Sequence, residues 1–165
     1  TVEQAMVRIV SFTEDMRKRG FEPGTRLLSS ALIPAPEDIA EKLQVTVGEQ
    51  IAYLERLRLA DGEPMAIEES HLVHLHCRGV LDADYARIPL RQALENNYGI
   101  QLVRARQVIR AIAASNRLAE LLAVKPKSPL LHLERISFSQ YDVPIEFLRI
   151  YYRADRYVLY NELQG

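Results

Sequence analysis

Hydrophobic and polar residues alternate in residues 54–59, and this pattern predicts a β-strand with two different faces. The alternation places Arg56 and Arg58 on one face of the strand and leucines on the other. The next segment, residues 61–64 (Asp-Gly-Glu-Pro), has the composition of a turn. We therefore predict that the chain reverses there and returns as a second strand, which brings Glu68 near the two arginines.

Two guanidinium groups on one strand face form a fork that suits a phosphate or a carboxylate. A carboxylate on the returning strand is placed to accept hydrogen bonds from hydroxyl or amine groups of the same ligand. These residues predict a site for a small, anionic, polyhydroxylated molecule. The alternative is a set of cross-strand ion pairs on a solvated face, which is common where arginine and glutamate lie on paired strands. The spacing alone leaves both interpretations open.

The same pattern occurs a second time in the chain. Residues 40–56 align without a gap with residues 119–135, at an offset of 79 residues, and 7 of the 17 positions are identical. A reversal follows each copy. Two copies with so long a period predict two related half-domains, each with a helix and a hairpin, rather than an array of short repeats. Because a duplicated domain often binds its ligand between the halves, Arg135 and Glu146 are candidate partners of the first arginine pair.

The remaining patterns define the fold class. Apolar residues at helical spacing, with caps and breakers, predict helices over residues 2–19, 37–43, 89–98 and 117–123. Strand patterns cover residues 25–33, 49–60, 64–72, 101–113, 129–140 and 144–153. This order predicts an α+β domain with a largely antiparallel sheet of about five or six strands. The helices are expected to flank the sheet, on one face or at its ends.

Composition agrees with a single compact domain over residues 1–165. The chain is 48% hydrophobic and 26% charged, and its net charge is −1, with dispersed basic residues. Such a chain is a poor candidate for binding DNA or a membrane surface by itself. It contains no run of 18 apolar residues that predicts a membrane-spanning helix. The single cysteine, Cys77, is typical of a protein of the reducing cytoplasm.

The sequence gives little support for a metal site or for nucleophilic catalysis. The candidate metal cluster is His71, His74, His76 and Cys77, but no acidic residue or second cysteine is placed to complete four ligands. We therefore expect no metal there, and Cys77 is interpreted as a buried small hydrophobe. No Gly-x-Ser-x-Gly motif and no glycine-rich phosphate loop are present, so no cofactor and no catalytic residue are predicted.

Four motifs together resemble a known family. They are residues 11–20 (Ser-Phe-Thr-Glu-Asp-Met-Arg-Lys-Arg-Gly), 54–64 (Leu-Glu-Arg-Leu-Arg-Leu-Ala-Asp-Gly-Glu-Pro), 95–99 (Glu-Asn-Asn-Tyr-Gly) and 152–157 (Tyr-Arg-Ala-Asp-Arg-Tyr). In this order they resemble the effector-binding UTRA domain of GntR-superfamily repressors of the HutC subfamily, over essentially the whole chain. The resemblance implies a chorismate-lyase-like fold, a homodimer, and an upstream winged helix-turn-helix domain that binds DNA and is absent from this chain.

The opening motif is similar to that of amino-sugar repressors, which sense glucosamine-6-phosphate or N-acetylglucosamine-6-phosphate. The resemblance implies a set of ligand-binding residues: the phosphate would be held by Arg56, Arg58, Phe12 and Thr13, and the sugar by Glu68 and by Tyr151 or Tyr152. The chain departs from the relatives at Pro89, where they often carry a serine whose hydroxyl lies near the phosphate.

Two functional classes follow from these observations. The first is a non-enzymatic sensor domain of a bacterial transcription repressor that binds a small sugar phosphate and modulates DNA binding of the attached domain. The alternative is a chorismate pyruvate-lyase-like enzyme of the same fold, which cleaves chorismate to 4-hydroxybenzoate and pyruvate. The fold alone does not separate the two, because both use arginines and a glutamate around an anion.

Overall fold

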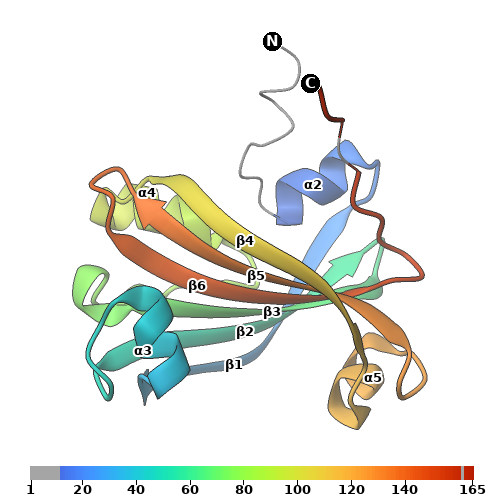
Figure 1. Cartoon of the computed structure of the whole chain (residues 1–165), viewed down its shortest axis with the longest axis horizontal. Helices are drawn as coiled ribbons and strands as arrows, with labels where there is room; N and C mark the ends of the chain where they lie inside the picture. The colour runs from blue at the N-terminus through green and yellow to red at the C-terminus, as the bar shows by residue number, and fades with distance from the viewer. Residues whose placement is uncertain (1–11, 161) are drawn as a thin grey trace.

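The computed structural model describes residues 12–160 and 162–165, and its centre is a six-stranded antiparallel sheet (Figure 1). The strands follow the order β1-β2-β3-β6-β5-β4, with bounds β1 Pro23–Pro34, β2 Gln50–Ala60, β3 Glu63–Val73, β4 Leu102–Ala113, β5 Pro129–Ser139 and β6 Pro144–Arg153. The α-helices are α2 Phe12–Lys18, α3 Glu37–Leu43, α4 Leu90–Tyr98 and α5 Asn116–Leu122. Two short 3₁₀ helices, His74–His76 and Val80–Asp82, connect β3 to α4.

These elements confirm the predicted α+β class and nearly all of the predicted bounds. The helix at 37–43 and the strand at 144–153 have the predicted limits, and the other strands differ from the prediction by at most two residues at either end. The helix predicted over residues 2–19 is described only from Phe12 to Lys18, because residues 2–11 lie outside the described part of the chain.

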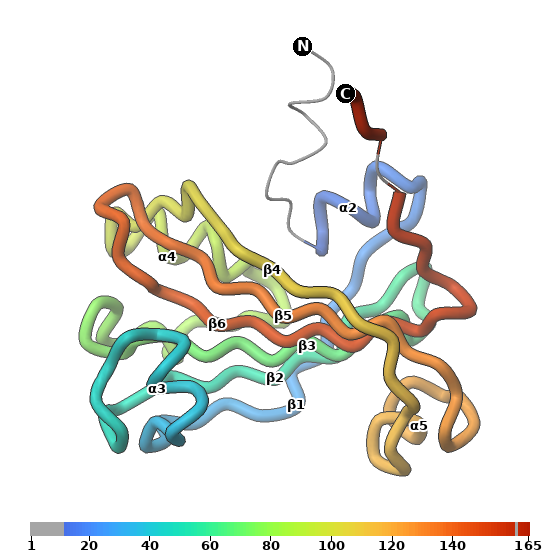
Figure 2. Tube along the Cα trace, in the orientation of Figure 1, coloured from blue at the N-terminus to red at the C-terminus, as the bar shows by residue number. Residues whose placement is uncertain are grey.

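The predicted duplication is visible in the structure (Figure 2). The elements β1, α3 and β2 recur as β4, α5 and β5 at an offset of 79 residues throughout. Both repeated helices end in the same way, with Gln44 and Ala123 at φ 57° and ψ 44°. The halves meet where β3 pairs with β6, so they share one continuous sheet.

The helices cover both faces of the sheet, so the expectation of one face or the sheet ends was wrong (Figure 1). Phe12 and Met16 of α2 pack with Ala66 and Leu148, while Ile39 of α3 packs on the other face. The helix α4 lies on the same face as α2, and α5 lies on the same face as α3. The reason is that both faces of the central strands carry apolar residues, so each face needs a cover.

The two helices on the far face tie the halves together. The helix α3, from the first half, packs on β6 of the second, and α5, from the second half, packs on β3 of the first. Ion pairs reinforce this exchange: Asp38 contacts Arg149 at 3.1 Å, and Arg117 contacts the buried Glu55 at 2.6 Å. Because each half holds the helix of the other, the sheet provides a rigid floor for the opposite face.

The end of α5 offers a test of the local backbone. Ala123 is an exposed residue in the left-handed region, where a side chain costs roughly 1–2 kcal/mol and glycine costs little. We expect Ala123→Gly to raise the melting temperature by about 1–4 °C, after the entropy cost of glycine is subtracted. Ala119→Gly, in the middle of the same helix, should lower it, because glycine disfavours a helix interior by about 1 kcal/mol. Differential scanning calorimetry measures the two changes in melting temperature. Equal changes of the same sign would contradict the left-handed conformation of Ala123.

Candidate ligand-binding site

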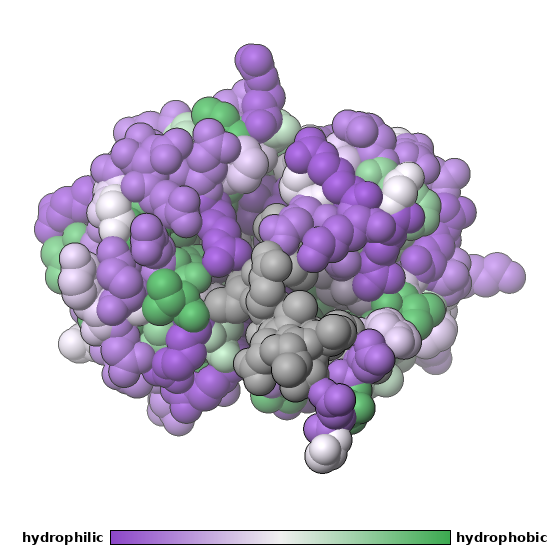
Figure 3. Space-filling model, turned by 90° about the horizontal axis from the view of Figure 1, so that it is seen from above, coloured by the Kyte–Doolittle hydropathy of each residue, from purple (hydrophilic) through white to green (hydrophobic). Residues whose placement is uncertain are grey.

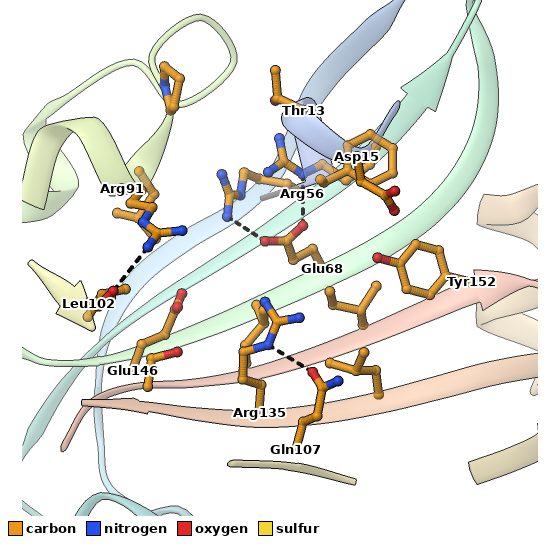
Figure 4. A pocket seen from close by; sticks show the side chains of 18 of the residues that line it. Thr13, Asp15, Arg56, Glu68, Arg91, Leu102, Gln107, Arg135, Glu146 and Tyr152 are labelled. Carbon is orange, nitrogen blue, oxygen red and sulfur yellow. Dashed lines mark hydrogen bonds and ion pairs between the residues drawn. The ribbon is translucent and has the colours of Figure 1, made fainter. Parts of the chain in front are cut away.

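A cavity of about 220 Å³ lies on the face of the sheet that carries α2 and α4 (Figure 4). Its volume is below the range of roughly 300–1,000 Å³ that is typical of sites for drug-sized ligands, so it suits a small molecule. Strands of both halves form its floor, α2 and the C-terminal segment (residues 157–160) form its roof, and the start of α4 lines one side. Figure 3 views the molecule from above, and the surface visible there is mostly hydrophilic.

The floor contains a buried cluster of two arginines and one glutamate. Glu68 accepts hydrogen bonds from both arginines: its Oε1 lies 3.1 Å from Nη2 of Arg56, and its Oε2 lies 2.9 Å from Nε of Arg58. Nη1 of Arg58 also donates to the Thr25 hydroxyl at 2.7 Å. The structure shows the cross-strand ion pairs, and the ligand site stays a prediction. The ion pairs exist, but they lie in the wall of a cavity and not on a solvated face.

Arg56 is the most constrained group of the cluster. Its side chain is 2% exposed, and within the described residues no hydrogen-bond partner reaches its Nε or Nη1 atom. Burial, together with the nearby charge of Arg58, lowers the pKa of Arg56 to about 10. Leaving donors of a buried charged group unpaired costs free energy, so a ligand acceptor at these atoms would be favoured.

The second half adds another arginine and another acid to the same cavity (Figure 4). Arg135 is the positional equivalent of Arg56 at the 79-residue offset, and its Nε donates to Oε1 of Gln107 at 3.1 Å. Glu146 lines the same cavity as Glu68 and accepts a hydrogen bond from Ser70. The structure thus brings together the first-half residues and both second-half candidates.

The two acids have pKa values shifted in opposite directions. Burial would raise the pKa of Glu68, but Arg58 and Arg56 hold it below its usual value. Burial and the charge of Glu68 raise the pKa of Glu146, and the Ser70 hydrogen bond offsets only part of this. Glu68 is therefore kept as a carboxylate, whereas Glu146 is the more easily protonated of the two acids.

The helix α2 and the C-terminal segment form a roof that is held by side-chain contacts. The guanidinium carbon of Arg58 lies 5.2 Å from the ring centroid of Phe12, and Thr13 lines the cavity beside it. Tyr157 donates to Oδ2 of Asp15 at 2.9 Å, and its ring stacks on Tyr152 with a centroid distance of 3.8 Å. Because Tyr152 lines the cavity, the ring stack and the hydrogen bond to Asp15 together connect the cavity to α2.

The structure separates the two tyrosines that the sequence left as alternatives. Tyr152 lines the cavity together with Leu148 and Ile150, which alternate with it along β6. Tyr151 points to the opposite face, where its ring stacks on His132 with a centroid distance of 4.3 Å. Tyr152 is therefore the member of the pair that the structure brings together with Arg56.

Pro89 lines the cavity at the start of α4, at the position where the family resemblance leads us to expect a serine. The next residue but one, Arg91, also lines the cavity, and its Nη2 donates to the backbone carbonyl of Leu102 at 3.0 Å. A charged donor is thus present on the same helix turn that lacks the hydroxyl group.

Sequence reasoning missed three polar residues of the site, Asp15, Ser70 and Gln107, whereas it had named Tyr157, with Tyr151 and Tyr152, as a candidate for lining a pocket. Two of them carried a usable signal. Ser70 lies two residues after Glu68, and so on the same face of β3, and Asp15 lies within the opening motif. Gln107 had none, because the register between β4 and β5 is a tertiary feature.

The histidine cluster does not converge in the structure. His71 lies at the end of β3, with its ring 5.7 Å from that of Phe147, while His74 and His76 belong to a short 3₁₀ helix. Among residues 12–160 and 162–165, no group of three or more His, Cys, Asp or Glu side chains is placed to hold a metal ion. Cys77 is fully buried, as predicted.

No helix among the residues that the structure describes is long and apolar enough to cross a membrane.

Fold and cavity together define an α+β domain with a small cavity rich in arginine. The chain belongs to the UTRA domain family, whose model matches residues 18–158. It is 34% identical over 156 residues to the HTH-type transcriptional repressor NagR of Bacillus subtilis. The match covers 94% of this chain and 64% of that protein. The chain therefore spans just under two thirds of that relative.

Solved structures agree with the family assignment. The ligand-binding domain of a GntR-family regulator from Bordetella bronchiseptica has a TM-score of 0.80 and 34% identity, with 87% of this chain and 90% of that chain covered. The effector domain of PhnF from Mycobacterium smegmatis has a TM-score of 0.88 and 28% identity, with 94% and 95% covered. The fold is thus the chorismate-lyase-like fold of UTRA domains, and the chain corresponds to the ligand-binding domain of GntR-family transcriptional regulators.

Proposed function

We propose that this domain binds a phosphorylated amino sugar, of the glucosamine-6-phosphate or N-acetylglucosamine-6-phosphate class, and so modulates DNA binding by an attached domain. The observation that carries the proposal is the buried Arg56 in the cavity wall, with two donor nitrogens unpaired among the described residues. A phosphate oxygen near these nitrogens and Arg58 would supply the missing acceptor.

The cavity has groups for both ends of such a ligand. Arg56, Arg58 and Thr13 offer donors for a phosphate, and the carboxyl groups of Glu68 and Glu146 offer acceptors for hydroxyl or amine groups. The resemblance to amino-sugar repressors supports the same assignment, with Tyr152 in the position of the sugar-contacting tyrosine. Arg91 is proposed to compensate for the missing serine hydroxyl at Pro89.

The roof suggests how binding is transmitted. The helix α2 closes the cavity and is the first described element of the chain, next to the segment where the resemblance places the DNA-binding domain. A ligand that favours one position of α2 would shift the spacing of two DNA-binding domains in a homodimer. The sheet is continuous, and α3 and α5 each pack on the other half, so we expect the roof, formed by α2 and the C-terminal segment, to move rather than the floor.

A ligand screen tests the proposal. We expect glucosamine-6-phosphate or N-acetylglucosamine-6-phosphate to raise the melting temperature by several degrees, since a ligand at a hundred times its dissociation constant adds about 2.7 kcal/mol. Inorganic phosphate and glucose-6-phosphate serve as controls for the anion and for the sugar. A larger shift with either control than with both amino-sugar phosphates would contradict the proposal. Turnover of chorismate in the same preparation would favour the lyase.

The contact between the C-terminal segment and α2 yields a separate prediction. Tyr157→Phe removes the hydrogen bond to Asp15 and keeps the ring stack on Tyr152. We expect backbone amides of residues 12–18 to exchange about five- to tenfold faster, because one lost hydrogen bond is worth roughly 1 kcal/mol. Hydrogen exchange with mass spectrometry measures this. Tyr160→Phe is the matched control, and equal acceleration in both variants would show that the bond does not hold α2.

A further inference from the structure

The proposed function uses the carboxyl group of Glu146 as an acceptor and makes no use of its ability to take up a proton. Glu146 projects from β6 into the cavity and is 7% exposed (Figure 4). Charged groups of three other strands surround it, namely Glu68 on β3, Arg56 on β2 and Arg135 on β5, and the thiol of Cys77 also interacts with it. Arg91 of α4 lines the same cavity. For a buried acid, a like charge favours the protonated form and opposite charges favour the carboxylate, so these neighbours act on Glu146 in opposite directions.

Each state of Glu146 has a partner in the surrounding structure. The carboxylate is stabilised by Arg56, by Arg135 and by a hydrogen bond from Ser70. The protonated acid is favoured by burial and relieves the repulsion from Glu68, whose own charge is held by its two arginines. Ser70 also accepts from Nη2 of Arg56 at 3.3 Å, so its hydroxyl links Glu146 to the arginine cluster.

A ligand group beside Glu146 would decide which state prevails. An ammonium group has only donors, so it pairs with the carboxylate. An amide carbonyl has only acceptor capacity on its oxygen, so it pairs with the O–H of the protonated acid. These two groups are what distinguish a free amino sugar from its N-acetylated form.

We propose that Glu146 determines specificity in this cavity by changing its protonation state: it binds a free amine of the effector as a carboxylate and an N-acetyl carbonyl as a carboxylic acid. The inference rests on the proposed function, because it requires an amino-sugar phosphate in the cavity. It adds a proton to the binding equilibrium of the N-acetylated ligand alone. The raised pKa of Glu146 supports it, because it reduces the cost of protonation near neutral pH.

The consequences are measurable. Binding of N-acetylglucosamine-6-phosphate takes up to one proton at Glu146, so its affinity falls as the pH rises. Binding of glucosamine-6-phosphate takes up none at this residue. Because the ligand amine and phosphate titrate as well, the variant Glu146→Gln serves as the reference for each ligand. Glutamine keeps an N–H donor for a carbonyl but cannot hold a negative charge or change protonation.

Isothermal titration calorimetry in two buffers of different ionisation enthalpy, at pH 6, 7 and 8, counts the protons. We expect wild type to take up more protons than Glu146→Gln with the N-acetylated ligand, and no more than the variant with the amine, whose binding releases any proton that Glu146 carries. The variant should also lose about tenfold or more in affinity for the amine, since a charge-assisted hydrogen bond is lost. It should bind the N-acetylated ligand about as well as wild type does at pH 6.

Several results would overturn the inference. One is an equal proton uptake by wild type and Glu146→Gln with the N-acetylated ligand. Another is an equal loss of affinity for both ligands in the variant, which would indicate a general structural defect. Glu134→Gln is the matched control, because Glu134 accepts from Arg149 on the opposite face of the sheet and should leave the proton counts unchanged. Failure of wild type to bind either ligand would overturn the proposed function together with this inference. If wild type binds but Glu146→Gln keeps the wild-type ratio of affinities for the two ligands, this inference alone is overturned.

Discussion

Arg58→Ala is expected to remove effector binding while the domain stays folded. Arg58 donates to Glu68 and Thr25 and lines the cavity, so it orders the site and offers charge to a phosphate. A charge-assisted hydrogen bond is worth about 1.5–3 kcal/mol, which corresponds to roughly ten- to a hundredfold in affinity. Glu68 keeps Arg56 as its partner in the variant, so no acid is left buried without a cation. Calorimetric titration with glucosamine-6-phosphate measures the loss.

One further variant separates the charge of Arg58 from its geometry, and another serves as a control outside the cavity. Arg58→Lys keeps the positive charge but not the planar fork, so it should retain only part of the affinity. Arg110→Ala removes an arginine that is ion-paired on the edge strand β4, outside the cavity, and should bind like wild type. If Arg58→Ala also bound like wild type, the phosphate would have to lie elsewhere.

Glu68→Leu is expected to have the largest effect on stability. It leaves Arg56 and Arg58, both buried, without their shared carboxylate. Removing one partner from a buried ion pair costs about 3–5 kcal/mol. For a domain of this size, that lowers the melting temperature by roughly 6–20 °C. Thermal unfolding followed by circular dichroism measures it, and Glu120→Leu, at an exposed position of α5, is the control that should change little.

The acid range tests the charge of Glu68 separately. Its pKa is held below its usual value in the folded state, so the carboxylate contributes stability above the unfolded-state pKa of about 4.3. That contribution is lost as the pH falls through the lower folded-state pKa. The difference in melting temperature between wild type and Glu68→Gln should therefore shrink from pH 5 to pH 3. A difference that stayed constant over this range would show that the charge does not matter.

The helices and strands were predictable because their signals are local. Alternation, turn residues and caps set the limits of each element within a few residues, and the offset of 79 residues identified the two halves. The face of the sheet on which each helix packs was less predictable. Helical periodicity shows that a helix has an apolar stripe, but it does not show which face of the sheet receives that stripe.

The site shows the same division at the level of single residues. Alternation along β2 correctly placed Arg56 and Arg58 on one face, since they are two residues apart. It left Tyr151 and Tyr152 as alternatives, because adjacent residues point to opposite faces and only the pairing of β6 with β3 decides which face is the cavity. Whether the arginines met solvent or a closed cavity depended on α2 and on the C-terminal segment.

The sequence by itself determined the α+β class, the duplicated half-domains, the arginine pair with its glutamate, and the family resemblance, because each is carried by residues close together or by a regular repeat. Only the tertiary structure decided that Glu68 binds both arginines, that Glu146 and Arg135 reach the same cavity, and that Tyr157 connects the cavity to α2. The physical reason is that strand register and helix packing set these contacts. They join residues as far apart as Asp15 and Tyr157, and no local pattern encodes them.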